Sequence, residues 1–222
     1  MVVACREKTI LTVAQRHKRK PEPLLLMQGK QELMKRADFG ATGKLWYPGQ
    51  NPASDALVLK ENAGKRGNGK KKLFVLLIRR SKECDGARRE WALPGGFIPS
   101  KGAKGEPFRF GDESPKATAV RELKEETGFR IPESRFGFEG RYGDPEFYSG
   151  SKKDERGDYS AWTLSYAFAV KLTKKEARNA RIRVNGGDDA DKAEWWPIDG
   201  LPRLAFDHED IIRHWLNRSG QQ

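Results

Sequence analysis

The chain has 222 residues, a formal net charge of +12 and a mean hydropathy of −0.80, and 33% of its residues are charged. This length suffices for one domain with a sizeable core, and no apolar run approaches the ~18–20 residues of a membrane span, so we expect a soluble protein that does not cross a membrane. The two cysteines, Cys5 and Cys84, make neither a metal-binding pattern nor a disulfide framework. A reducing compartment, the cytoplasm, is therefore expected.

Residues 1–45 are predicted to form a basic N-terminal extension that is partly irregular, with a short helix near Gln31–Arg36. The first twenty residues contain six basic residues and one acidic residue. We interpret this segment as a mobile basic arm, and targeting to an organelle is the alternative interpretation.

Residues 46–222 are predicted to form one domain in which strands surround a central helix. Short apolar runs bounded by polar or glycine-rich segments indicate strands, which are expected at Ser54–Lys60, Lys72–Arg80, Glu90–Leu93, Arg135–Tyr142, Ala161–Lys171 and Ala193–Ile198. The stretch Asn62–Lys71 is expected to be a long hairpin loop, and Asp207–Asn217 a C-terminal helix. Strands before and after a central helix, followed by a terminal helix, suggest a mixed sheet between helices.

The central helix carries its own start and stop signals. Ser114 is a good N-cap, and Pro115 fits the first helical position. Gly128 is placed to end the helix in a left-handed conformation, with Phe129 supplying a hydrophobic contact beyond it. An apolar stripe that can be buried against a sheet consists of Ala119, Val120 and Leu123.

Three carboxylates lie on one side of this helix. At about 3.6 residues per turn, Glu122 and Glu126 form an i,i+4 pair, and Glu125 follows Glu122 at i+3. Like charges so placed repel each other, which implies a positive partner. Arg121 stands at i,i+4 to Glu125 and can orient that carboxylate, while hard oxygen ligands gathered in this way suit Mg²⁺ bound to substrate phosphates. An ordinary solvated amphipathic helix is the alternative.

The segment resembles the Nudix box, whose pattern is G-x5-E-x7-R-E-U-x-E-E-x-G-U with U aliphatic or aromatic. The positions that fit at the right spacing are Glu113, Arg121, Glu122, Leu123, Glu125, Glu126, Gly128 and Phe129. The residue six before Glu113 is Pro107 instead of glycine, and the glycine that fits is Gly96, in the segment Trp91–Phe97. We therefore expect an insertion at residues 97–112, which a loop tolerates at modest entropic cost and which leaves the role of Glu113 open.

The resemblance implies an α/β/α sandwich with a mixed central sheet, and a hydrolase that uses Mg²⁺, with Mn²⁺ as the alternative metal. It implies that Glu122 and Glu126 are the first metal ligands and that Glu125 is the next. The backbone carbonyl of Gly95, just before the box glycine, is a further implied ligand, and Glu113 is implied as a supporting residue.

Segments outside the box resemble ADP-ribose pyrophosphatases, particularly the bacterial kind and the mitochondrial type. In chain order they are Trp46–Pro52, Tyr142–Pro145, Gly187–Ala190 followed by Glu194–Trp196, and Leu204–His208. This resemblance implies hydrolysis of the diphosphate of ADP-ribose to AMP and ribose 5-phosphate. The segment 146–157 departs from the family and is interpreted as a second insertion.

The general base of the family often stands on a loop late in the fold, where this chain has Asp188 and Asp189, and Glu125 is a further catalytic candidate. A turn whose aspartates bond to the local backbone is the alternative interpretation of that loop. Substrate contacts are expected from Arg141, Tyr142, Asp144, Trp162 and Phe206. For the aromatic residues among them, core packing is the more common role.

The positive charge fits attraction of a small polyanionic nucleotide better than nucleic-acid binding, because the basic residues are dispersed and no stacking motif interleaves them. Other Nudix substrates stay open, namely dinucleoside polyphosphates, NADH, oxidised nucleotides and capped RNA. A non-catalytic ADP-ribose-binding module is a further alternative, although it would be expected to have lost box carboxylates, and none is lost. A homodimer also stays open, since dimers are common among the ADP-ribose-cleaving relatives.

Overall fold

The structure of the protein is a computed structural model that describes Tyr47 and residues 49–62, 72–81, 90–103, 106–143, 152–153, 159–179 and 190–220. The predictions for the N-terminal extension, for the helix at Gln31–Arg36 and for most of the loop at Asn62–Lys71 fall outside these residues. Among the described residues, no helix is both long and apolar enough to cross a membrane.

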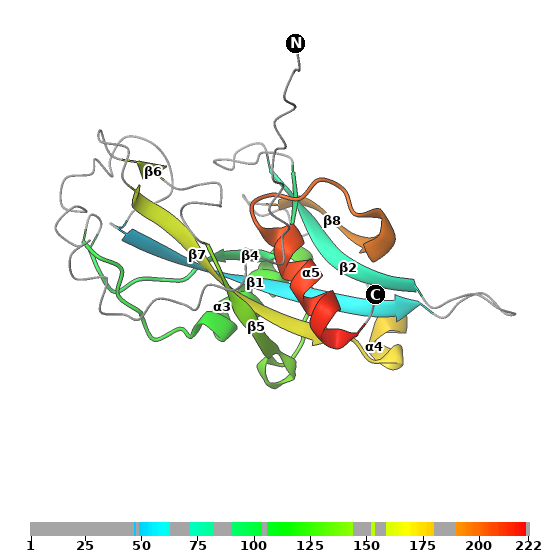
Figure 1. Ribbon diagram of the computed structural model, residues 1–222. Helices are drawn as coiled ribbons and strands as arrows, with labels where there is room; N and C mark the ends of the chain where they lie inside the picture. The colour runs from blue at the N-terminus through cyan, green and yellow to red at the C-terminus, as the bar shows by residue number, and fades with distance from the viewer. Residues whose placement is uncertain are drawn as a thin grey trace, which may run out of the picture.

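Groups of strands are separated by helices along the described chain, as Figure 1 shows. The strands are β1 (Gly49–Asn62), β2 (Lys72–Arg80), β3 (Trp91–Ala92), β4 (Gly95–Phe97), β5 (Gly137–Tyr142), β6 (Lys152–Lys153), β7 (Tyr159–Lys171) and β8 (Ala190–Pro197). The α-helices are α3 (Pro115–Thr127), α4 (Lys174–Asn179) and α5 (His208–Ser219), and two short 3₁₀ helices are η2 (Glu133–Arg135) and η3 (Ile198–Gly200).

The strands form one mixed sheet, which confirms the predicted sheet type. The main order is β3-β2-β1-β7-β5, while β4 pairs with β1, β6 with β7 and β8 with β2. The long central strands β1 and β7 are parallel, from Gly49 opposite Ala161 to Leu59 opposite Lys171, and the other pairs are antiparallel. The parallel pair at the centre requires the chain to cross over between its strands, and α3 and β5 lie in that crossover.

Helices cover both faces of the sheet, as the alternation of side chains on β1 and β2 requires. One face packs against α3 through fully buried residues that include Ala56, Val58, Leu76, Ala119 and Leu123. The other face packs against α5 through Leu57, Leu59, Val75, Leu77, Ile211 and Ile212. Figure 1 shows α5 lying across the sheet on one side, with α3 on the other. The predicted α/β/α sandwich is therefore confirmed.

Several element boundaries differ from the prediction. The first predicted strand, Ser54–Lys60, is the buried half of β1, whose polar beginning from Gly49 is held by pairing with β7. The last predicted strand begins earlier, at Ala190, because it follows β2 to its end. The elements that were not predicted are β4, α4, the two short 3₁₀ helices and the short strand β6, which lies inside the expected insertion 146–157.

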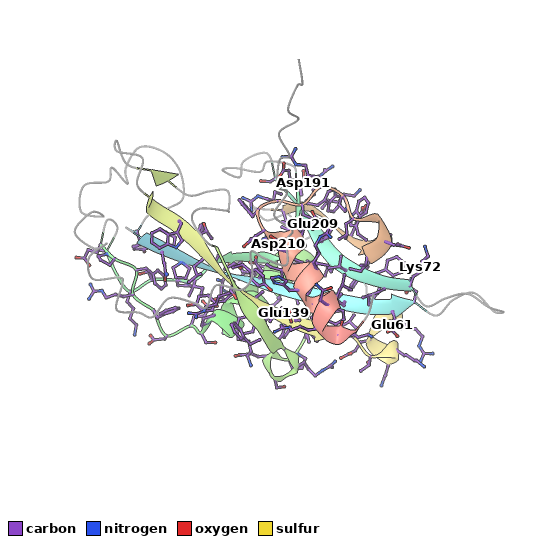
Figure 2. All side chains as sticks on the ribbon, viewed as in Figure 1. Glu61, Lys72, Glu139, Asp191, Glu209 and Asp210 are labelled. Atoms are coloured by element: carbon purple, nitrogen blue, oxygen red, sulfur yellow. The ribbon has the colours of Figure 1, made fainter. Side chains whose placement is uncertain are left out.

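The ends of α5 are stabilised by charge and by a left-handed cap. Its first turn carries Glu209 and Asp210, labelled in Figure 2, where negative charge favours the positive end of the helix dipole. At the other end Gly220 has φ 64° and donates its N–H to the carbonyl of Leu216. Near that end Arg218 pairs with Glu139 of β5, also labelled in Figure 2, which ties the helix to the sheet.

Three titratable side chains are buried where the sheet meets the start of α5: Asp55, Asp207 and His208. Burial raises the pKa of Asp55 to about 6, although a hydrogen bond from Ser165 opposes this, and burial likewise raises the pKa of Asp207 to about 6. Burial lowers the pKa of His208 to about 4, and attraction to Asp207 offsets this only in part. The imidazole of His208 is therefore neutral at neutral pH.

We expect His208 to make folding stability fall as the solution becomes acidic. Its pKa is about 4 in the folded protein and 6.5 in the reference state, so between these values the unfolded chain binds a proton that the folded protein does not. Relative to His208→Asn, which cannot titrate, the wild-type protein should lose roughly 2 kcal/mol of stability between about pH 7.5 and about pH 4.5. Urea unfolding at both pH values measures this difference.

Because the variant keeps Asp55 and Asp207, the titration of these acids is present in both proteins and does not create the expected trend. A stability difference that stays constant with pH would show that the imidazole of His208 is not held neutral by burial.

Candidate functional site

The helix that carries the box, α3, is fixed at both ends as the sequence predicts. The Ser114 hydroxyl accepts a hydrogen bond from the N–H of Ala117 at 3.1 Å, and Pro115 is the first helical residue. Gly128 has φ 69° and donates its N–H to the carbonyl of Lys124 at 2.9 Å. With its apolar side buried on the sheet, the helix presents its arginine and its three glutamates along the adjoining side at a fixed rotation.

Arg121 gathers three of the predicted carboxylates around one guanidinium. Its nitrogens lie 3.0 Å from Glu113, 2.8 Å from Glu122 and 2.8 Å from Glu125. Partial burial opposes a raised pKa for Arg121, but attraction to Glu122 and the hydrogen bonds to Glu113 and Glu125 outweigh it and raise that pKa. The positive partner that the repelling carboxylates require is thus supplied within the box, and the predicted contact between Arg121 and Glu125 is confirmed.

The fourth carboxylate, Glu126, faces the turn between β3 and β4. It is 7% exposed, and its Oε2 accepts a hydrogen bond from the N–H of Gly95 at 2.9 Å. The next residue, Gly96, lies against Glu122: a Cβ at position 96 would lie 2.4 Å from Glu122 Oε1. A side chain at this position would displace the Glu122 carboxylate from its present place, so Gly96 fits the position of the box glycine.

The expected insertion at 97–112 folds back on itself before it reaches α3. Ser100 and Phe110 form an antiparallel bridge. The N–H of Lys101 donates to the carbonyl of Arg109 at 2.9 Å, and the Ser100 hydroxyl accepts from the N–H of Arg109 at 3.2 Å. This closed loop returns the chain to Glu113, whose Oε1 accepts from Nε of Arg121. The extra length thus leaves Glu113 in contact with the box.

A row of aromatic rings anchors the same loop. Phe108 meets Tyr47 and Phe110 edge to face, with ring centroids 5.7 and 5.0 Å apart, and Phe110 meets Tyr166 of β7 at 6.2 Å. Edge-to-face pairs of this kind add about 0.5–1.5 kcal/mol each beyond the burial of their area. The loop is therefore held against Tyr47 and against β7 by side-chain packing as well as by its own hydrogen bonds.

The chemistry of the box side chains fits a hard divalent cation. Among the residues that the structure describes, no three His, Cys, Asp or Glu side chains are already arranged around one point as a metal site, because the carboxylates contact Arg121 or Gly95. The donors are nevertheless carboxylate oxygens beside a backbone turn that can approach closely only because Gly95 and Gly96 lack side chains. Mg²⁺ is usually bound by a few protein carboxylates, and phosphate oxygens of the substrate and water complete its coordination.

Two buried residues, Asp55 and His208, lie on the α5 side of the turn. Asp55 was not predicted as part of the site, and for His208 the sequence left both a helix cap and a ligand contact open. His208 Nδ1 accepts a hydrogen bond from the N–H of Leu93 at 2.8 Å. Asp55 lies directly beneath Gly95, since a Cβ at position 95 would be 2.2 Å from its Oδ1. The one local signal for Asp55 is a charged residue at the start of the buried apolar run of the predicted strand Ser54–Lys60, and His208 ends the segment Leu204–His208 that resembles ADP-ribose pyrophosphatases.

The predicted substrate-binding residues are spread over the fold. Tyr142 and Trp162 are each 6% exposed, and the Tyr142 hydroxyl lies 3.1 Å from Nδ1 of His214. Arg141 is exposed on β5. Phe206 is 39% exposed, close to His208 and to the guanidinium of Arg80. Asp144, Asp188 and Asp189 lie outside the described residues.

Comparison with known proteins agrees with this geometry. The sequence model of the NUDIX domain matches residues 54–216. The ADP-ribose pyrophosphatase of Methanocaldococcus jannaschii is 31% identical over 168 residues, which cover 74% of this chain and 72% of that protein.

Two solved structures share the fold. The NUDIX domain of Shewanella oneidensis NrtR, complexed with ADP ribose, has a TM-score of 0.51 at 22% identity and covers 86% of this chain and 98% of its own. A MutT/nudix family protein from Enterococcus faecalis has a TM-score of 0.54 at 21% identity, and the match covers 96% of this chain and 76% of that protein. Since the family model spans most of the chain and the box residues lie together in the structure, the chain belongs to the Nudix family.

Proposed function

We propose that this Nudix hydrolase cleaves the diphosphate of ADP-ribose to AMP and ribose 5-phosphate with the help of Mg²⁺. The observation that carries the proposal is the 31% identity to an ADP-ribose pyrophosphatase over 168 residues. All four carboxylates of the box are present as well. Three of them form ion pairs with Arg121, and the fourth accepts a hydrogen bond from the N–H of Gly95. A protein that only bound the nucleotide would have no need for this set.

The substrate sets the chemical problem. Two negative phosphates repel an incoming nucleophile, and when bound, Mg²⁺ neutralises that charge and polarises a phosphoryl oxygen. In this proposal Glu122 and Glu126 hold the metal, with Glu125 next and the Gly95 carbonyl as a backbone ligand. Glu113 supports this set through Arg121, which it contacts at 3.0 Å.

A base must accept the proton of the attacking water. Glu125 is the most exposed of the box carboxylates, with 55% of its side chain accessible, and one of its oxygens is held by Arg121. Its second oxygen makes it a candidate for this role within the described residues. Asp188 and Asp189 are the other candidates that the family resemblance implies.

Phe206 is the aromatic candidate best placed for contact with a nucleobase. Its ring is 39% exposed, and the guanidinium of Arg80 lies 5.1 Å from its centroid. Its φ of 54° is the sole positive value at a residue other than glycine in the described chain. Such strain costs on the order of 1–3 kcal/mol and is typical of functional sites, which supports a binding role for this ring.

We expect Glu126→Gln and Glu122→Gln to lower kcat on ADP-ribose by on the order of 100-fold or more, because each removes a charge that the phosphoryl-transfer site uses. The measurement incubates each protein with Mg²⁺ and a panel of ADP-ribose, NADH, dinucleoside polyphosphates, oxidised nucleotides and capped RNA, and follows the products by chromatography. Glu133→Gln, an exposed acid of η2, is the matched control.

Cleavage of another compound in preference to ADP-ribose would replace the proposed substrate and keep the catalytic role. If no compound is cleaved, or if Glu126→Gln is as active as the parent, the catalytic proposal itself is wrong.

Removing divalent metal is expected to abolish the activity, and added Mg²⁺ or Mn²⁺ to restore it, because the carboxylates alone cannot neutralise a diphosphate. Binding of Mn²⁺ followed by electron paramagnetic resonance should weaken roughly 10–100-fold in Glu122→Gln. An unchanged Mn²⁺ affinity in that variant would remove Glu122 from the ligand set, whatever the activity shows.

A further inference from the structure

The Leu93–Gly96 turn is held from both layers of the sandwich. On the α3 side, Glu126 accepts the N–H of Gly95 at 2.9 Å. On the α5 side, His208 accepts the N–H of Leu93 at 2.8 Å. Between them the N–H of Ala56 donates to the carbonyl of Pro94 at 2.8 Å, which attaches the turn to β1. Three successive residues of the turn are therefore fixed by three different elements.

The contact with Leu93 fixes the tautomer of His208. A backbone N–H can only donate, so Nδ1 must be unprotonated, and a neutral ring then carries its hydrogen on Nε2. Nε2 faces Oδ1 of Asp55 at 3.6 Å, which is longer than a hydrogen bond but close enough for the carboxylate to favour a hydrogen at Nε2. The hydroxyl of Ser165 donates to the other oxygen of Asp55.

Ser165, Asp55 and His208 thus form a buried polar chain that ends at the amide of Leu93. Each of the three side chains is at most 5% exposed. Burying an acid and an imidazole costs free energy that an apolar core residue would not. Their hydrogen bonds offset part of this cost, and the backbone that they fix is the turn that faces Glu122 and Glu126.

The Asp55 carboxylate and the β1 backbone at Ser54 together limit how closely the turn can approach β1. Oδ1 of Asp55 would lie 2.2 Å from a Cβ at position 95, so the carboxylate is in direct contact with the Gly95 backbone. A displacement of the Asp55 carboxylate is therefore expected to disturb that backbone, and with it the carbonyl group of Gly95.

We propose that His208, with Asp55 behind it, is a positioning residue that holds the Leu93–Gly96 turn so that the Gly95 carbonyl and the Glu126 carboxylate serve one metal site. This inference rests on the proposed function, because the metal site is part of that function. It assigns the start of α5, on the opposite layer from the box helix, an indirect role in the reaction.

Two substitutions separate positioning from simple packing. In His208→Asn, the amide oxygen can take the place of Nδ1 and still accept from Leu93, although the smaller side chain leaves a cavity. In His208→Gln, the amide fills more of the space but lies one bond further out, where the ring has Nε2. If His208 is a positioning residue, kcat and Mn²⁺ affinity should be higher in the variant that keeps an acceptor at the δ position, His208→Asn. If His208 only fills space, kcat and Mn²⁺ affinity should be higher in whichever variant is more stable.

The experiment measures kcat and KM with Mg²⁺, Mn²⁺ affinity by electron paramagnetic resonance, hydrogen exchange of the Leu93 amide by NMR, and unfolding in urea. We expect His208→Gln to lower kcat and Mn²⁺ affinity roughly 10–100-fold, as loss of a group that orients a ligand does, and to speed exchange at Leu93. His208→Asn should restore both to within about threefold of the parent despite being the less stable variant.

Glu139→Gln is the matched control, because Glu139 is also buried at 8% exposed and also faces α5, yet it lies on β5 away from the turn. It should lose stability without losing kcat or Mn²⁺ affinity. The proposal is overturned if kcat and Mn²⁺ affinity of the two His208 variants rank with their stability, or if both variants match the parent. Should the parent itself cleave none of the nucleotides, the proposed function fails, while Mn²⁺ affinity and Leu93 exchange still decide the positioning role.

Discussion

The close approach of one backbone turn to carboxylates on two sides is the constraint on which the site depends. Gly96 lies against Glu122 from the box helix, and Gly95 lies against Asp55 from β1. A methyl group at either position would overlap a carboxylate oxygen, at 2.4 and 2.2 Å respectively. At this turn β4 pairs with β1, and side chains from both helix layers contact the backbone. The two adjacent glycines leave space for these carboxylates beside the paired strands.

The charges around Arg121 are partly balanced within the box and still leave it suited to a cation. Glu113, Glu122 and Glu125 share one guanidinium, so three negative charges and one positive charge leave a formal excess of two negative charges. Arg121 limits the repulsion within the helix, and a divalent cation matches the excess that is left. These ion pairs are partly exposed, and their value for stability alone is therefore modest.

Local signals predicted the parts of this fold that depend on neighbouring residues. The caps at Ser114 and Gly128 and the apolar run of β2 are read from short segments, and the structure confirms them. The strand β4 was missed because three residues containing two glycines have no strand character apart from their pairing with β1. The role of His208 could not be decided between a helix cap and a ligand contact, because its partner Leu93 is 115 positions away and no sequence pattern relates the two.

The insertion at 97–112 shows that the box depends on contacts more than on spacing. The family pattern places the glycine six residues before its first glutamate, whereas here the glycine is Gly96 and the glutamate is Glu113. The bridge between Ser100 and Phe110 removes most of this extra length, and the aromatic row holds the loop beside β7. Glu113 consequently reaches Arg121 at 3.0 Å. A longer loop that closes on itself leaves the charges of the site in place, since what orients Glu125 is the arginine and what orients Glu126 is the turn.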